Sequence, residues 1–347
     1  MQSKLTRMIR RFVVGTNVFI AGAILGYAQE AQPLRLIQAI PLPNVHGYID
    51  HMDADVEGKR LFVPTVDNGS LEVVDLTNGR VIRSIPGFKT PAGASYVPEL
   101  NKLFVTSKGD GMVRVFRGDT LDLIDSIKLE LGPNRVMYDP VTKFLYVGYG
   151  GRDAGFEYGR IGVIDAQSHK LLGDMIFETN RPGEILLDRA ARRILISESY
   201  ADRIDVFDAR DLQLLLTWSS RGRLPVDMGF DPIRHRLFVG TRQPPEMTVY
   251  DSDSGQEVVS LPTVETMDGV DYDARNKRVY VSGGLGLETG VYVYQQIDAD
   301  HYELIGKVPI RGGAGTSHWV PGLNRYFVAA PTYEKQDAAI LVFEPQP

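Results

Sequence analysis

The chain has 347 residues, of which 43% are hydrophobic and 24% charged, and its formal net charge is −6. These proportions are typical of a soluble globular protein with enough apolar surface for a core. The acidic balance disfavours wholesale binding to nucleic acid or anionic lipid, and the absence of cysteine excludes disulfides, thiolate metal sites and cysteine nucleophiles.

Residues 1–28 predict a secretory signal peptide. A head with four basic residues and no acid is followed by an apolar run over residues 12–25 and by small residues before Gln29. A retained membrane anchor is the alternative, but a run of about 15 residues is short against the ~20 that span a bilayer. Cleavage would remove four positive charges and take the formal charge from −6 to −10. We therefore expect a periplasmic or secreted protein with no membrane span after cleavage.

A short apolar-aromatic run recurs seven times in the rest of the chain. Successive runs, which we call anchors, begin 42, 42, 49, 43, 42 and 47 residues apart, and a basic residue usually stands one or two places before them. Such a period is the signature of a repeat architecture. The anchors are Leu61–Val63, Leu103–Val105, Leu145–Val147, Ile194–Ile196, Leu237–Val239, Val279–Val281 and Tyr326–Val328.

Each anchor is followed by a second strand pattern, as in Val73–Asp75 and Val249–Asp251. Several of these end in a turn such as Asp75–Gly79, where Asp bonds nearby backbone and Gly supplies a positive φ. Almost no stretch sustains a helical period. Each repeat therefore reads as about four short strands, as in a propeller blade.

The ends of the chain predict how the ring closes. The last repeat stops at Pro347 just after its third strand, and residues 34–40 before the first repeat resemble an outer strand. Joining the two would protect edges that are otherwise unpaired. We predict an all-β fold: one seven-bladed β-propeller over residues 34–347, closed by an N-terminal strand that joins the last blade.

The repeats resemble the YVTN-type β-propeller repeat family, which includes the YncE-like exported bacterial proteins. The resemblance rests on Tyr146-Val147-Gly148, on Tyr280-Val281-Ser282, on corners such as Gly132-Pro133-Asn134 and on the Val-x-Asp strands. It covers essentially everything after residue 28 and implies an exported propeller. Some relatives are associated with nucleic-acid binding, and similar repeats occur beside haem or copper domains and in lactonase-like enzymes.

The innermost strand of each blade should begin where the central channel opens. Counting back ten and eleven residues from the start of each anchor locates these positions, and many of them are polar. Carboxylates from separate blades that converge on one axis shift one another's pKa or hold a cation. Channel mouths are also wet, so polar residues are expected there without function. The predicted ligand-binding residues are Asp50, His51, Asn134, Arg135, Glu184, Asp227 and Asp268.

Two repeats carry longer loops, at residues 150–160 and 332–338, between their second and third strands. Both loops should rise on the same face as the polar mouth, where Phe156, Tyr158 and Tyr333 would be placed to cover a ligand. Binding loops concentrate on one face of a rigid scaffold. This coincidence favours the mouth as the functional end of the channel.

Two functions of different class remain open, because no phosphate loop, nucleophile elbow or metalloprotease motif occurs. The favoured one is a monomeric binding or interaction scaffold whose mouth takes a small anion or a protein partner. The alternative is a metal-dependent lactonase-like hydrolase, with His51 assisting proton transfer. Its only cofactor would be a divalent cation such as Ca²⁺, held by Glu184, Asn134, Asp227 or Asp268. Single-stranded nucleic acid is a third partner, which the net charge disfavours.

Overall fold

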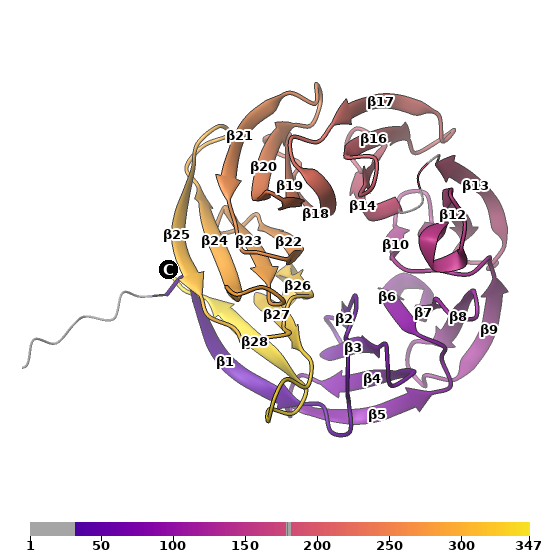
Figure 1. Ribbon diagram of the computed structural model, residues 1–347. Coiled ribbons are helices and arrows are strands. Elements are labelled where there is room, and N and C mark those ends of the chain that lie inside the picture. Colours follow the sequence, from indigo (N-terminus) through magenta and orange to yellow (C-terminus); the bar gives the residue numbers. More distant parts are fainter. Residues whose placement is uncertain (1–31, 178, 180–181) are drawn as a thin grey trace, which may run out of the picture. The chain divides into compact units, whose positions relative to one another are not determined.

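The computed structural model describes residues 32–347 except 178, 180 and 181, so the expected signal peptide at 1–28 lies outside the described residues. Residues 32–347 form seven four-stranded antiparallel sheets around an axis (Figure 1). The predicted seven-bladed propeller is confirmed. No helix in the described part of the chain is long and apolar enough to cross a membrane.

The blades are numbered in chain order, with strands given from the channel outward. Blade 1 consists of β2 (Asp53–Asp55), β3 (Arg60–Thr65), β4 (Ser70–Asp75) and β5 (Arg80–Pro86). Blade 2 consists of β6 (Pro91–Val97), β7 (Lys102–Ser107), β8 (Met112–Arg117) and β9 (Leu123–Lys128). Blade 3 consists of β10 (Val136–Asp139), β11 (Phe144–Gly150), β12 (Gly159–Asp165) and β13 (Leu171–Phe177). Short 3-10 helices lie at Pro98–Leu100, Gly151–Ala154 and Pro321–Leu323.

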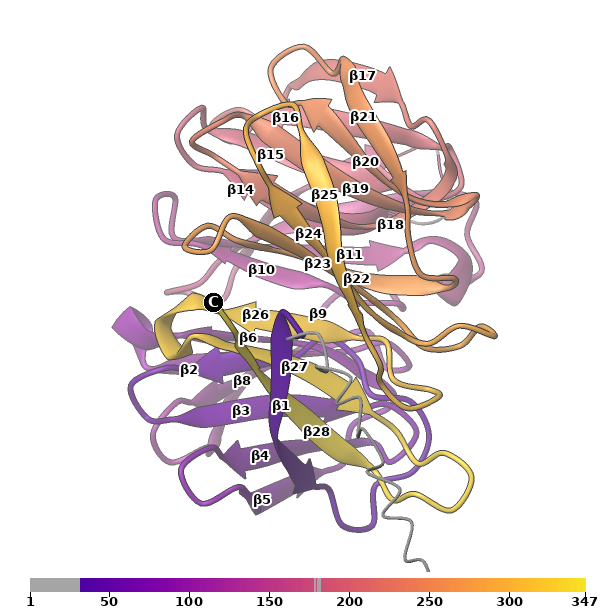
Figure 2. The same cartoon turned by 90° about the vertical axis from the view of Figure 1, so that its left-hand side faces the viewer.

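The remaining four blades follow the same plan, and Figure 2 shows them from the side. Blade 4 consists of β14 (Pro182–Asp188), β15 (Arg193–Glu198), β16 (Arg203–Asp208) and β17 (Leu214–Ser219), and blade 5 of β18 (Arg223–Asp231), β19 (Arg236–Gln243), β20 (Pro245–Asp251) and β21 (Glu257–Pro262). Blade 6 consists of β22 (Met267–Asp273), β23 (Arg278–Gly283), β24 (Gly290–Gln296) and β25 (Tyr302–Val308). Blade 7 consists of β26 (Ser317–Val320), β27 (Arg325–Ala330) and β28 (Ala339–Pro345), with β1 (Leu34–Pro41) outermost.

Every anchor lies in the second strand of its blade, and no anchor side chain is more than 1% exposed. Successive side chains of a strand point to opposite faces, so one anchor contacts both neighbouring blades. In blade 3, Leu145 and Val147 share a core cluster with Phe104 of blade 2. Tyr146 faces the other way, into a cluster with Ile194 of blade 4. The core is thus a series of layers between blades.

A basic residue or asparagine stands two places before each anchor because the hairpin turn there needs a left-handed residue. All seven have φ between 48° and 65°. That conformation disfavours L-residues, and Asn adopts it more readily than most. The position also lies at the surface end of the hairpin, where a long charged side chain is solvated. The seven residues are Lys59, Asn101, Lys143, Arg192, His235, Lys277 and Asn324.

The residue directly before the anchor has a different role, since in four blades it bridges to the next blade. Lys102 donates to the carbonyl oxygens of Ala166 and Gln167, at 3.1 and 2.9 Å. Arg193 donates to the carbonyl oxygen of Ser252, at 2.9 Å. Arg278 reaches the carbonyl oxygen of Gln346 beside the last blade, at 2.6 Å. These three side chains, with Arg236, are called bridging residues below.

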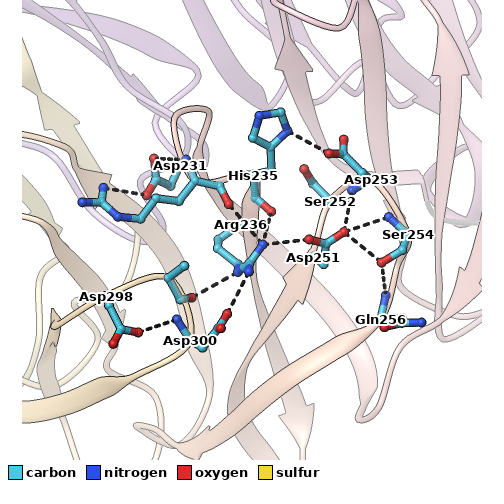
Figure 3. A network of polar contacts seen from close by, with 12 residues as sticks. Asp231, His235, Arg236, Asp251, Ser252, Asp253, Ser254, Gln256, Asp298 and Asp300 are labelled. Atoms are coloured by element: carbon cyan, nitrogen blue, oxygen red, sulfur yellow. Dashed lines mark hydrogen bonds and ion pairs between the residues drawn. The ribbon is translucent and has the colours of Figure 1, made fainter.

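Figure 3 shows the bridge made by Arg236, whose guanidinium lies between blades 5 and 6. It binds Asp251 within its own blade at 2.8 Å, and it binds Asp300 of the next blade at 2.8 Å. It also donates to the carbonyl oxygen of Ala299. A planar guanidinium suits this place because its several N–H groups serve both blades at once.

The other three blades lack such a bridge. Arg60 pairs with Asp55 of its own blade at 2.6 Å and lies over the ring of Tyr96. Arg325 pairs with Glu344 of its own blade, and blade 3 has Phe144 at the equivalent position. Of these three residues only Arg60 reaches the next blade, through the Tyr96 ring, so at interfaces 3–4 and 7–1 the residue before the anchor makes no hydrogen bond to the next blade.

The ring closes through β1, which pairs antiparallel with β28 from Leu34 opposite Pro345 to Pro41 opposite Ala339 (Figure 1). A bulge between Leu36 and Gln38 interrupts the register. The pairing gives the last blade its fourth strand. The predicted closure by the N-terminal segment is confirmed.

Replacing a bridging residue should destabilise the propeller more than replacing its non-bridging counterpart. We expect Arg193→Leu to lower the free energy of unfolding by about 3 kcal/mol, because Asp188, its buried partner at 2.6 Å, is left without a counter-charge. Arg325→Leu, at the same position of the last blade, should cost under about 1 kcal/mol. Urea unfolding followed by fluorescence measures both, and equal losses would contradict the bridging role.

Candidate functional site

One cavity at the channel mouth, of about 250 Å³, is lined by all seven residues predicted from the sequence. They lie together because every blade starts its inner strand at the same end of the channel. Their positions just before or within these strands were found by counting from the anchors. Ligand binding by them stays a prediction.

The counting missed other residues that line the same cavity, notably Tyr48, Lys108 and Arg242. Lys108 and Arg242 come from the ends of second strands, not from inner strands. Both stand five residues after the first residue of an anchor, as does Ser199, which also lines the cavity. A second count, forward from each anchor, would have found these three.

Arg135 is the centre of the polar network in the mouth. Its Nε donates to Glu184 at 2.8 Å, and its Nη2 lies 4.0 Å from Asp227. Its Nη1 lies 2.6 Å from Nδ1 of His51. A guanidinium can only donate, so Nδ1 of His51 accepts and the ring proton belongs on Nε2. That nitrogen faces Asp50 at 3.2 Å.

The other two carboxylates of the mouth are also paired. Asp50 accepts from Nζ of Lys108 at 3.1 Å. Asp268 accepts from Nη2 of Arg242 at 2.8 Å and from the hydroxyl of Tyr48 at 2.7 Å. Each carboxylate therefore has a cationic neighbour. The described residues contain no group of three or more His, Asp or Glu placed to hold a metal ion.

Exposure separates the two signs of charge. The carboxylates of Asp50, Glu184, Asp227 and Asp268 are 4%, 4%, 12% and 18% exposed. The side chains of Lys108, Arg135 and Arg242 are 22%, 23% and 28% exposed. The acids that line the cavity are thus less exposed than the bases that pair with them.

Burial raises the pKa of three of the four acids in the mouth. It raises the pKa of Glu184 well above its usual range, with the charge of Asp227 adding to the effect. It also raises the pKa of Asp227 to about 6 and that of Asp268 in the same direction. For Asp50 burial is outweighed by His51 and Lys108, which lower its pKa. The pKa values of Glu184 and Asp50 are thus shifted in opposite directions.

Asn134 carries a hydrogen-bond acceptor that has no donor among the described residues. Its Oδ1 is buried and accepts no hydrogen bond from the described residues. Leaving such an atom unpaired costs about 1–3 kcal/mol. The atom is closed off from the cavity, so a ligand O–H or N–H group reaches it only after the Asn134 side chain turns.

His51 and Arg135 also line a second chamber of the channel, of about 420 Å³, together with Tyr96, Tyr138 and His318. No other residue lines both spaces. The contact between His51 and Arg135 therefore forms the partition between mouth and chamber. Arg135, the centre of the polar network, therefore lies between the two cavities of the channel.

The two long loops lie between β11 and β12 and between β27 and β28, as expected. In the first, the rings of Phe156 and Tyr158 stack with centroids 5.1 Å apart. Among the described residues neither ring lines the mouth cavity, nor does Tyr333. Leu285, from the hairpin between β23 and β24, does line it, as do Lys108 and Ser199 from the equivalent loops of blades 2 and 4. Covering of a ligand by the aromatic loops stays a prediction.

No protein-family model matches the chain, and no curated protein matches it. Among solved structures, it is similar to a chain in "Crystal Structure of Mitotic Checkpoint Complex", with a TM-score of 0.77, 10% identity and 99% of each chain covered. It is also similar to a chain of Kuenenia stuttgartiensis hydrazine synthase, with a TM-score of 0.60, 17% identity, and 70% of this chain and 81% of that chain covered. At these identities the likeness shows the propeller fold alone.

The raised pKa of Asp227 predicts that this residue makes stability fall with rising pH. Between its usual pKa of 3.8 and about 6, the folded protein keeps a proton that the unfolded chain has released. The free energy of unfolding should therefore fall from pH 4 to pH 6, by roughly 3 kcal/mol at most from this group. Asp227→Asn should flatten that part of the profile. Denaturant unfolding at pH 4, 5, 6 and 7 measures it, and an unchanged slope in the variant would contradict the assignment.

Proposed function

We propose that this protein is an exported, non-catalytic binding propeller that takes a small anionic ligand at the channel mouth. The observation that carries the proposal is the order of charge in the cavity. Lys108, Arg135 and Arg242 line the cavity, are more exposed than its carboxylates, and are each held in an ion pair by one of them. Such fixed donors suit a carboxylate or phosphate group, since charge-assisted hydrogen bonds are the strong ones.

Size and polarity narrow the ligand class. A cavity of about 250 Å³ lies below the ~300 Å³ at which drug-sized pockets begin, so the ligand is a small metabolite-sized acid. The unpaired Oδ1 of Asn134 calls for a donor on the same molecule. A hydroxylated carboxylate supplies both groups, and malate is the simplest probe of that kind.

Membership of the YVTN-type repeat family and export through a cleaved signal peptide belong to the same proposal. The seven anchors, the Asp-led turns and the basic N-terminal head support them. As an alternative to a small anion, a protein partner would bind over the face that bears the channel mouth. The solved structure titled as a mitotic checkpoint complex holds a similar propeller within a protein assembly, at a likeness of fold alone.

The metal-dependent hydrolase stays a prediction, with its divalent cation. A cation in the mouth would compete with Lys108, Arg135 and Arg242 for the same carboxylates. Addition of Ca²⁺, Mg²⁺, Mn²⁺ or Zn²⁺ to the protein, with the unfolding midpoint and lactone turnover as readouts, tests this alternative directly.

Malate should bind saturably to the purified protein lacking residues 1–28, and more tightly than succinate, which lacks the hydroxyl. Lys108→Gln/Arg242→Gln should weaken malate binding by tenfold or more, because two charge-assisted hydrogen bonds are lost, each worth about 1.5–3 kcal/mol. Asn134→Ala should remove the preference for malate over succinate. Isothermal titration calorimetry measures all three.

Arg223→Gln is the matched control, because Arg223 begins β18 in the loop-bearing face but is 73% exposed and pairs with Asp202 outside the cavity. Its malate affinity should equal that of the parent protein. An equal loss in both variants would show that overall charge, not the mouth, governs binding. Absence of binding by malate, succinate and phosphate alike would overturn the proposal.

A further inference from the structure

A separate cavity of about 210 Å³ lies between blades 3 and 4. Its walls are the hairpin turn between β10 and β11, the turn between β14 and β15, and the turn that follows β16. These turns join the strand ends that lie away from the mouth, so the cavity opens on the opposite face of the propeller. It shares no lining residue with the mouth cavity.

The cavity coincides with a missing bridge. In blades 2, 4, 5 and 6 the residue before the anchor extends a basic side chain to the turn of the next blade. In blade 3 that residue is Phe144, which packs into the core cluster that includes Ala209. Phenylalanine has no donor for the carbonyl oxygens of the turn after β16. The interface is left with an opening where other blades place a cation.

Four arginines line this opening, and two of them are already engaged. Arg193 binds Asp188 at 2.6 Å, and Arg210 makes two hydrogen bonds to Asp208, at 3.0 and 2.6 Å. Their guanidinium groups are therefore neutralised within the protein. They add donors to the wall but little free charge.

The other two arginines are available to a ligand. The side chain of Arg192 is exposed and forms no hydrogen bond or ion pair with any residue that the structure describes. Arg189 is 54% exposed, and its one ion pair, to Asp139, is long at 3.8 Å. Asp139 is already used by the backbone N–H groups of Val141 and Thr142. One cation without an ion pair among the described residues, Arg192, and one with a single long ion pair, Arg189, thus border one small cavity of an acidic protein.

The apolar part of the wall is formed by Val141, Leu187 and Ala209, next to Asp139, Thr142 and Asp188. Val141 is 59% exposed. We propose that this cavity is a second binding site, for a small amphipathic anion. The apolar part of the ligand lies on Val141, Leu187 and Ala209, and its carboxylate, phosphate or sulfate group lies between Arg189 and Arg192. The volume limits the ligand to one below the usual ~300 Å³ of drug-sized pockets.

Hexanoate, hexanol and inorganic phosphate separate the parts of this claim, with ligand-observed NMR and calorimetry as measurements. The parent protein should bind hexanoate saturably. It should bind hexanol and phosphate at least about tenfold more weakly, because hexanol lacks the anionic group and phosphate lacks the apolar chain. Arg189→Gln/Arg192→Gln should weaken hexanoate binding by the same factor. Val141→Glu, which places a negative charge on the wall, should abolish it.

Lys277→Gln is the matched control, because Lys277 occupies the turn position of Arg192 in blade 6 and is likewise exposed. It loses a positive charge at the same turn and should keep the parent affinity for hexanoate. Unchanged unfolding midpoints show that each variant is folded. Equal binding of hexanol would overturn the need for an anion, and equal loss in Lys277→Gln would reduce the effect to overall charge.

Competition separates this site from the mouth. Saturating malate should leave hexanoate binding unchanged, since the two cavities have no lining residue in common. Displacement of hexanoate by malate would place hexanoate at the mouth and overturn the second site. If malate does not bind at all, the double arginine variant still decides the second site, independently of the proposed function.

Discussion

The pairing of β1 with β28 is the constraint on which the rest of the propeller depends. It joins residues about three hundred positions apart, Leu34 opposite Pro345 among them. β1 contributes to the core on both sides of the last blade, with Ile40 in the cluster toward blade 1 and Leu34 in the cluster toward blade 6. Only a closed ring brings all seven inner strands to one axis, and only that convergence assembles the mouth.

Much of the fold follows from local pattern. The side chains of each anchor alternate between the two faces of a strand. The residue two places earlier, in the left-handed conformation of the turn, is Lys, Arg, His or Asn. The ends of the repeats, read with residues 34–40, indicated the closure as well. These features are legible because strand burial and turn geometry depend on neighbours in sequence.

The mouth was predictable in position but not in chemistry. Counting from the anchors placed Glu184 and Asp227 together, yet nothing in their spacing showed that Arg135 lies between them. The pKa values depend on burial and on such contacts, which are properties of three-dimensional packing. The cavity beside Phe144 was hidden for a related reason. It results from the absence of a side chain that only comparison among folded blades shows to be missing.

The distribution of charge gives each face a distinct character. At the mouth, bases are held in place by buried acids, so their orientation is fixed before any ligand arrives. Between blades 3 and 4, Arg189 and Arg192 lie on turns and have few partners. The proposed site at the axis is therefore preorganised, and the proposed site in the opposite face is looser.

The closing pair also governs when the molecule can fold. During synthesis β1 is made long before β28, which is complete only when residues 339–345 have been added. Contacts of such high sequence separation form slowly, because the entropy of closing the long intervening loop precedes any gain. Until then β1 presents an unpaired edge to other chains. The waiting first strand is thus the part of a nascent propeller that most needs protection from premature pairing.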